Sequence, residues 1–202
     1  MPYAPKLKES ASQTAGPYVH IGCVPTFAGL EGMYDGDLGK TMITGDAKGE
    51  RIVVEGIVYD GGGNPLRDAM VEIWQADANG VMNSPEDGRP FDAGFTGWGR
   101  QPSNGDTGEF RFETIKPGAV PFKGDTMQAP HLHVWVVARG INLGLNTRMY
   151  FEDEAEANAA DPVLNKIEAR NRVDTLIAKK EGNTYRFDIY IQGPNETVFF
   201  DV

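Results

Sequence analysis

The sequence predicts a mostly β fold: a β-sandwich with an irregular N-terminal arm and a short helical insertion. Runs of alternating apolar residues recur along the chain, and most of them end at clusters of Gly, Pro, Asn or Asp. One stretch, residues 152–182, instead carries apolar residues at helical spacing. Several short strands separated by turn signals, with a single helical segment, are typical of a sandwich.

The composition indicates one globular domain. Of the 202 residues, 40% are hydrophobic and 24% are charged, so the chain can build a core and does not belong to the disordered class. The net charge of −10 disfavours nucleic acid and anionic membranes as partners, since both bind clustered Lys and Arg. Cys23 is the only cysteine, so no internal disulfide can form. We find no signal-peptide or membrane-span pattern and expect a cytoplasmic protein.

The chain divides into an arm, residues 1–50, and a sandwich, residues 51–202, which we expect to form a single domain. The arm shows no clear period, but its aromatic and aliphatic side chains disfavour disorder. Long irregular segments with apolar side chains often cover a contact surface. We therefore expect the arm to lie at a subunit interface.

Period-two alternation predicts the strands. We expect them at residues 52–58, 70–75, 109–114, 131–138 and, less regularly, 147–151. A last hairpin is predicted from residues 185–191 and 197–200, with its turn at residues 193–196. The run at residues 131–138 is apolar on both faces, which indicates a central strand. Residues 77–108 show no clear period and predict a long irregular segment.

The helical insertion carries a start signal and a stop signal. Residues 152–160 are rich in Ala and Glu, and Asp161 followed by Pro162 is a common start of a helix. Apolar residues then recur at helical spacing until Gly182, where we expect the helical region to end.

The pair His131 and His133 is the clearest candidate for chemistry in a chain with three histidines. Residues i and i+2 of a strand point to the same face, so both imidazoles can reach one ion of iron, copper or zinc. Two histidines do not complete a site, since three or four protein ligands are usual. The alternative is a half-buried, hydrogen-bonded pair without a metal.

Four blocks of sequence resemble the intradiol ring-cleaving dioxygenases: residues 71–77 (VEIWQAD), 114–118 (TIKPG), 129–133 (APHLH) and 185–189 (YRFDI). Three more blocks are similar to the alpha-type chains of two-chain members that cleave protocatechuate: residues 12–22 (SQTAGPYVHIG), 138–142 (ARGIN) and 196–201 (ETVFFD). The resemblance extends from about Ser12 to the end of the chain. It implies a β-sandwich of the intradiol dioxygenase type and a role in aromatic catabolism, in the beta-ketoadipate pathway.

The resemblance implies an iron(III) site with two Tyr and two His ligands, where O2 is inserted between the two hydroxylated carbons of a catechol. Here Met82 and Val120 stand where the ligand tyrosines would be, so both phenolates are missing. His131 and His133 would then be a remnant of the family pair. We expect no metal and no catalytic residue in this chain, and Fe(III) in a catalytic beta subunit that pairs with it in a hetero-oligomer.

The resemblance also implies that this chain completes the partner's substrate pocket. The matching substrate-binding residues are Thr14, Gly16, Pro17, Tyr18 and Arg139. A guanidinium suits the carboxylate of protocatechuate, which the family converts with O2 to 3-carboxy-cis,cis-muconate. Structural roles remain as alternatives to substrate binding: an interface salt bridge for Arg139, packing for Tyr18, and a simple turn for Gly16 and Pro17.

Two other functions remain possible from the residues alone. One is an autonomous metalloenzyme in which His131 and His133 bind a metal together with Asp or Glu from residues 77–108. The other is a non-enzymatic β-sandwich interaction protein. The apolar arm favours a subunit of a larger enzyme over the interaction protein.

Overall fold

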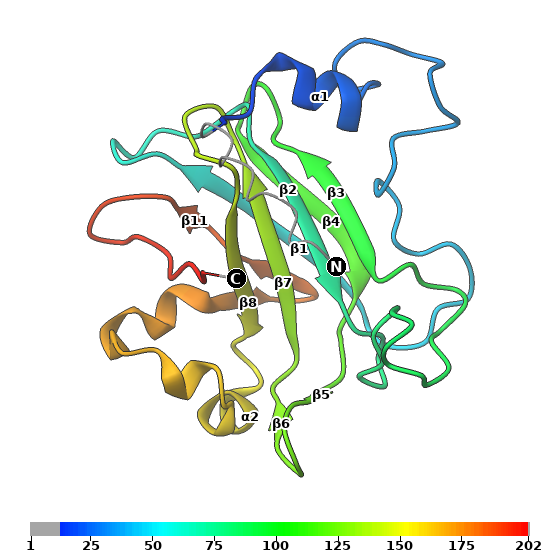
Figure 1. Cartoon of the computed structure of the whole chain (residues 1–202), viewed down its shortest axis with the longest axis vertical. Helices are drawn as coiled ribbons and strands as arrows, with labels where there is room; N and C mark the ends of the chain where they lie inside the picture. Colours follow the sequence, from blue (N-terminus) through cyan, green and yellow to red (C-terminus); the bar gives the residue numbers. More distant parts are fainter. Residues whose placement is uncertain (1–12, 202) are drawn as a thin grey trace, which may run out of the picture.

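The computed structural model describes residues 13–201, in which two layers of strands pack face to face (Figure 1). The elements in chain order are α1 (Pro17–Cys23), β1 (Arg51–Tyr59), β2 (Met70–Gln75), β3 (Trp98–Pro102), β4 (Glu109–Ile115), β5 (Val120–Pro121), β6 (Met127–Gln128), β7 (His131–Val137), β8 (Leu145–Phe151), α2 (Ala155–Ala160), η1 (Leu164–Lys166), η2 (Arg170–Leu176), β9 (Ile177–Glu181), β10 (Thr184–Arg186) and β11 (Ile189–Tyr190).

The front layer has the strand order β3-β2-β7-β8, with every neighbouring pair antiparallel. The back layer has the order β4-β1-β10-β9, and β11 also pairs with β1. A parallel pairing of β8 with β9 joins the layers, with Tyr150 opposite Ile177 and Phe151 opposite Ala178. One hydrogen-bonded sheet therefore folds over itself. The predicted mostly β sandwich and the central position of β7 are confirmed.

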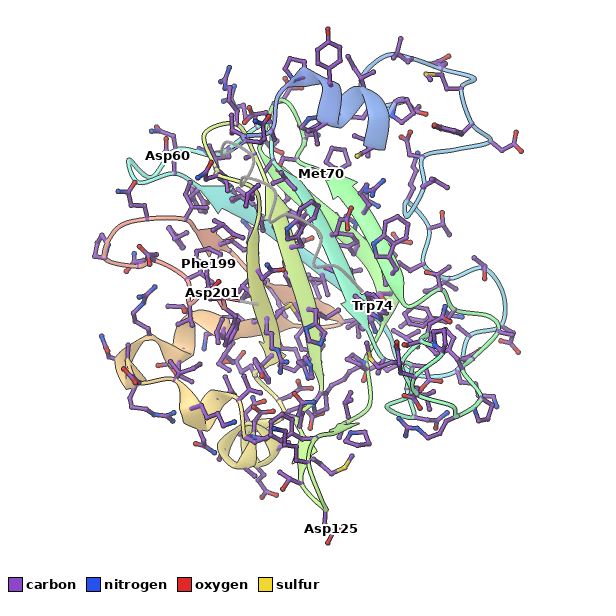
Figure 2. The ribbon with its side chains drawn as sticks, in the orientation of Figure 1. Asp60, Met70, Trp74, Asp125, Phe199 and Asp201 are labelled. Carbon is purple, nitrogen blue, oxygen red and sulfur yellow. The ribbon has the colours of Figure 1, made fainter. Side chains whose placement is uncertain are left out.

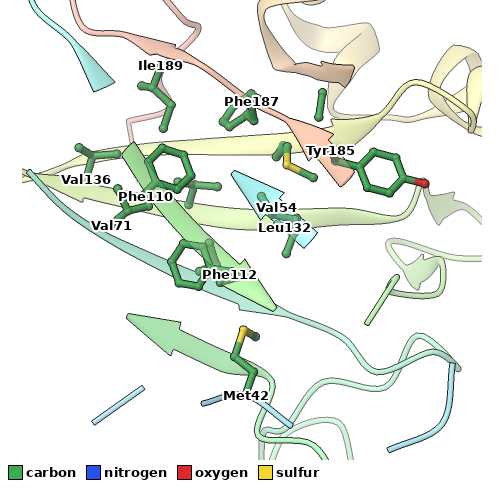
Figure 3. Packing of buried hydrophobic residues seen from close by; sticks show 14 of the residues in the cluster. Met42, Val54, Val71, Phe110, Phe112, Leu132, Val136, Tyr185, Phe187 and Ile189 are labelled. Carbon is green, nitrogen blue, oxygen red and sulfur yellow. The ribbon is translucent and has the colours of Figure 1, made fainter. Parts of the chain in front are cut away.

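The main core lies between the two layers. In β2, Val71 and Ile73 are buried in this core while Trp74 is 45% exposed on the outer face, as the alternation predicts. Phe110 and Phe112 of β4 pack in the same cluster (Figure 3). Each such buried side chain contributes about 1.5–3 kcal/mol to folding, so the two-layer arrangement follows from the pattern of the strands.

A buried amide connects the layers across the core. The side chain of Gln75 in β2 donates from Nε2 to the carbonyl of Ile115 in β4 at 2.9 Å. Its Oε1 accepts a hydrogen bond from the Thr114 hydroxyl at 2.7 Å. Gln75 and Thr114 are both fully buried, so these bonds fix the position of β2 relative to β4.

The expectation of an irregular segment over residues 77–108 is wrong at β3. Gly99 of this strand faces the core, where an added Cβ would lie 2.7 Å from the Met42 sulfur and 3.1 Å from Phe112. A glycine at the inward position removes the apolar alternation by which a strand is recognised. The strand forms because its backbone pairs with β2.

The predicted continuous helical region is also wrong beyond residue 160. Within residues 152–182 only α2 is an α-helix; two 3-10 segments follow, and residues 177–181 form strand β9. Leu164 and Leu176 reach a second cluster beside Tyr150, which short 3-10 turns allow. Helical spacing of apolar residues therefore does not distinguish these turns from a helix.

The predicted C-terminal hairpin is wrong in its pairing. Strand β10 pairs with β9 and, in parallel, with β1, and residues 197–200 form no strand of the ladder. Phe200 instead forms an isolated bridge with Asn146 of β8, and its N–H donates to the Asn146 carbonyl at 2.8 Å. The C-terminal segment thus crosses to the front layer.

The arm contacts the sandwich at both of its described ends. Gly16 caps α1, which begins at Pro17, so the sequence Gly16-Pro17 starts a helix rather than a simple turn. Thr14 forms a bridge with Asn142, and Met42 belongs to the main core. Residues 1–12 lie outside the described residues, and the division into arm and sandwich stays a prediction.

Asp161 is a buried carboxylate at which three segments meet. Its Oδ2 accepts the N–H of Ala129 at 2.8 Å, and its Oδ1 accepts the N–H groups of Val163 and Leu164, each at 2.8 Å. The Tyr150 hydroxyl donates to Oδ1 at 3.3 Å. As predicted, Asp161 accepts N–H groups of the turn that follows it, but this turn is a 3-10 turn with Val163 at its N-cap, and Asp161 is also the C-cap of α2.

We expect Asp161→Ala to lower the free energy of unfolding by about 3 kcal/mol, because it removes a cap and leaves buried N–H groups without acceptors. Urea unfolding followed by circular dichroism measures this change. Asp125→Ala is the matched control, since Asp125 is exposed in the loop between β5 and β6 (Figure 2). Equal urea midpoints for the two variants would show that the Asp161 carboxylate does not stabilise the fold.

Candidate functional site

His131 and His133 lie at the start of β7 and share one face of the front layer, as predicted. His131 is 3% exposed, and its Nδ1 lies 2.7 Å from the carbonyl oxygen of Ala129. A carbonyl only accepts, so Nδ1 carries the proton and Nε2 of His131 is an acceptor. The two Nε2 atoms lie 3.3 Å apart, so Nε2 of His133 donates to that of His131. The two imidazoles are therefore hydrogen-bonded to each other.

Arg148 of β8 lies opposite His133 and places a cation beside the pair. Its Nη1 donates to Gln128 Oε1 at 2.8 Å and to the Tyr150 hydroxyl at 3.3 Å. Burial, and then the positive charge of Arg148, lower the pKa of His131 to about 4. Burial, then the neighbouring His131 and then Arg148, lower the pKa of His133. Both imidazoles are neutral at neutral pH.

The segments that carry Met82 and Val120 lie side by side. A Cβ on Gly80 would meet the Ala119 carbonyl at 1.9 Å, and Gly80 has a φ of 72°, so only glycine fits there. Val120 pairs with Gln128 in the short β5–β6 ladder that leads into β7. Both segments therefore lie near the start of β7, which carries the His pair. Met82 and Val120 offer no anionic oxygen.

The described residues do not fit an iron(III) site. Within residues 13–201 no group of three or more His, Cys, Asp or Glu is arranged to hold a metal. Carboxylates of the 77–108 segment have other partners: Asp77 accepts the N–H groups of Asn79 and Val81, and Asp87 pairs with Arg89. Ferric ion prefers anionic oxygen donors, and the guanidinium of Arg148 opposes a second cation near the pair.

A second surface brings together residues that are far apart in sequence. Thr14 Oγ1 accepts the N–H of Gly140 at 2.8 Å, next to Arg139. Gly16, Pro17 and Arg139 line one pocket of about 530 Å³. Four of the five predicted substrate-binding residues therefore lie on one surface, formed by the arm and the turn after β7.

Arg139 and Tyr18 are both highly exposed in this region. The Arg139 side chain is 81% exposed, and its Nε lies 3.5 Å from Asp68 Oδ2, which makes a weak surface ion pair. Tyr18 is 84% exposed on α1, so packing in this chain's own core is wrong for it. Contact with substrate stays a prediction for all five residues.

The sequence interpretation missed Arg148, Gln128 and Asp68. The alternation of residues in β8 could have indicated Arg148, because Asn146, Arg148 and Tyr150 share one face of this strand. The pairing of β8 with β7 places that face beside the His pair. Asp68 has no such signal, because its contact with Arg139 depends on how two loops meet.

Comparison with known proteins identifies the family. A family model described as Dioxygenase matches residues 24–193. The chain is 48% identical over 199 residues to the protocatechuate 3,4-dioxygenase alpha chain of Pseudomonas putida, covering 96% of this chain and 97% of that one. The chain belongs to the intradiol dioxygenase family. Members of this family are generally iron-dependent.

Other members of the intradiol dioxygenase family match over much of their length. The alpha chain of protocatechuate 3,4-dioxygenase from Burkholderia cepacia is 42% identical, over 97% of this chain and 98% of its own. The beta chain from the same organism is 36% identical, over 82% of this chain and 75% of its own. The solved 3-chlorocatechol 1,2-dioxygenase of Rhodococcus opacus matches with a TM-score of 0.58 at 21% identity, over 76% of this chain and 65% of its own, which supports the fold alone.

Within residues 13–201, no helix has the length and apolar character needed to cross a membrane. The cytoplasmic location stays a prediction.

His131 should make the stability of the fold depend on pH. Its pKa falls from 6.5 to about 4 on folding, so between these values the unfolded chain binds more protons. Stability is therefore lost as the pH falls through this window. We expect His131→Gln to reduce the loss between pH 7 and pH 5 by about 2 kcal/mol in urea unfolding. His20→Gln, which leaves the pair intact, should keep the full dependence, and an unchanged pH profile in His131→Gln would contradict this interpretation.

Proposed function

We propose that this chain is the non-catalytic alpha subunit of a protocatechuate 3,4-dioxygenase. It completes the substrate pocket of a beta subunit that carries iron(III), and the assembly cleaves protocatechuate with O2 between its two hydroxylated carbons. The observation that carries the proposal is a His pair without anionic oxygen donors, in a chain that matches alpha chains over nearly its whole length.

The exposed arm supports a partner subunit. Large apolar side chains that are exposed gather between residues 18 and 38, among the residues that the structure describes: Tyr18, Phe27, Leu30, Met33, Tyr34 and Leu38. Such a gathering of apolar side chains favours a contact surface over open solvent. The similarity to a beta chain supports a partner of the same fold.

In this proposal each residue of the arm surface has a physical role. Arg139 binds the substrate carboxylate, and the Asp68 ion pair at Nε leaves the terminal nitrogens of the guanidinium for that contact. Thr14 holds the turn that carries Arg139 through its bond to Gly140. Gly16 has open space where a Cβ would stand, so it leaves room for a ring to approach. The partner's iron(III) supplies the ring-cleaving chemistry.

Iron analysis of the full chain, expressed alone and together with a beta subunit, tests the proposal. The chain alone should contain no stoichiometric iron and show no visible charge-transfer colour, while the co-purified complex should have both and cleave protocatechuate. Iron and colour in the chain alone, lost in His131→Ala, would instead establish an autonomous metalloenzyme. A chain that binds no beta subunit would be an interaction protein of another kind.

Arg139→Gln should raise the KM of the complex for protocatechuate by about tenfold or more, because a charge-assisted hydrogen bond to the carboxylate is lost. The KM for catechol, which lacks this carboxylate, should change little. Arg67→Gln is the matched control, since Arg67 lines the same pocket and carries the same charge. Parallel changes for both substrates would assign Arg139 to the subunit interface instead.

A further inference from the structure

The loop between β3 and β4 carries an exposed Asn-Gly sequence, Asn104-Gly105. The backbone of Asn104 is fixed, since its N–H donates to the Glu109 carbonyl at 2.8 Å and its carbonyl accepts the N–H of Gly108 at 2.7 Å. Asn104 and Gly105 are both exposed, and a Cβ on Gly105 would meet nothing within 4 Å. The side-chain amide of Asn104 and the backbone nitrogen that follows it therefore lie together in open solvent.

Two backbone donors hold the side-chain carbonyl of Asn104. Its Oδ1 accepts the N–H of Asp106 at 2.8 Å and the N–H of Thr107 at 3.0 Å. When a nucleophile adds to Cγ of Asn104, negative charge develops on this oxygen. Two fixed N–H groups at these distances are the arrangement with which enzymes stabilise an oxyanion. The turn thus favours attack at Cγ.

The backbone nitrogen of Gly105 is available as the attacking group. Among residues 13–201, no acceptor forms a hydrogen bond with its N–H. A solvent-exposed N–H without such a bond loses its proton to hydroxide readily, whereas a bonded N–H is protected. Glycine adds no side chain that would hinder the approach to Cγ. The two groups belong to neighbouring residues, so ring closure needs no second molecule to be positioned.

The other Asn-Gly sequence of the chain, Asn79-Gly80, is arranged differently. The N–H of Gly80 donates to the Asp77 carbonyl at 3.0 Å, and Gly80 is buried. The N–H of Asn79 donates to Asp77 Oδ1 at 2.8 Å, so this turn is held from both residues. The Ala119 carbonyl packs directly against it. The same dipeptide is therefore open to reaction at position 104 and protected at position 79.

We propose that Asn104 is a self-modification site, which converts to aspartate and isoaspartate in the folded protein. Hydroxide removes the proton of the Gly105 N–H, and the nitrogen attacks Cγ of Asn104. A bond forms between this nitrogen and Cγ, the bond from Cγ to Nδ2 breaks, and Nδ2 leaves as ammonia after taking a proton from water, which returns the hydroxide. Water then opens the cyclic imide at either carbonyl, which gives aspartate or isoaspartate. Water is the only co-reactant.

The conversion introduces a negative charge into a turn that borders the pocket of Gly16 and Arg139. Gly105 lines this pocket together with Arg67 and Arg139. A carboxylate nearby lowers the positive potential that the two arginines create. Isoaspartate also lengthens the main chain, because the side-chain methylene becomes part of it. The consequence for substrate binding rests on the proposed function, whereas the conversion itself does not.

Peptide mass spectrometry tests the proposal on the full-length chain, incubated in mildly alkaline buffer in the assembly in which it purifies. The peptide of Asn104 should gain the mass change of an amide that becomes an acid about tenfold faster, or more, than the peptide of Asn79. In guanidinium chloride the two rates should become similar, because both sites share the same dipeptide and the fold no longer distinguishes them. The readout is independent of iron, of a beta subunit and of activity.

Gly105→Ala is the deciding variant, because the open space and the absence of a positive φ let alanine fit at this position. Its methyl group hinders ring closure, so the conversion of Asn104 should slow by about tenfold or more. Gly22→Ala, at another exposed glycine with open space around it, is the matched control and should leave the rate unchanged.

Equal rates at Asn104 and Asn79 in the folded wild type, or an unchanged rate in Gly105→Ala, would overturn the proposal. So would an Asn104 that stays unconverted in the purified assembly while it converts in guanidinium chloride, since the fold or a partner would then protect it. The comparison of the two asparagines uses wild-type protein and therefore holds even if the variant fails to fold.

Discussion

The carboxylate of Asp161 connects the helical insertion to the two strands that carry the His pair and Arg148. It holds Ala129, whose carbonyl in turn fixes the tautomer of His131. Through Tyr150 it also reaches Arg148, which contacts Gln128. The insertion, the start of β7 and the outer face of β8 are thus held by one charge. A buried polar network of this kind is stable because each member has a partner.

The same network surrounds the His pair. The two Nε2 atoms lie 3.3 Å apart, and Arg148 adds a positive charge nearby. In the proposed function, Met82 and Val120 stand where the ligand tyrosines would be, and the His pair is a structural hydrogen bond at the start of a central strand. In the proposed assembly, the chain's role has moved from the metal to the surface that faces the substrate.

The sequence predicted those parts of the fold in which side-chain pattern and backbone pairing agree. Strands β2, β4 and β7 place a hydrophobic residue at each inward position, and the pattern located all three. Strand β3 was not predicted, because Gly99 stands where Met42 and Phe112 leave no room for a side chain. The insertion was predicted to be a helix because apolar residues recur in its 3-10 turns at spacings similar to those of an α-helix. For the site, the motifs located the arm residues and Arg139, but the ion pair with Asp68 and the hydrogen bonds of Arg148 depend on tertiary contacts.

The contact between Gly80 and Ala119 limits the changes of loop length that this chain can accept during evolution. The carbonyl of Ala119 lies where a side chain on Gly80 would begin. The loop that contains Gly80 and the loop that contains Ala119 are therefore packed directly against each other and move together. A length change in either loop displaces its neighbour, whereas a change of side chain at Met82 or Val120 leaves the backbone in place. Point substitutions at Met82 and Val120 can therefore change the side chains that these loops present without rebuilding the loops.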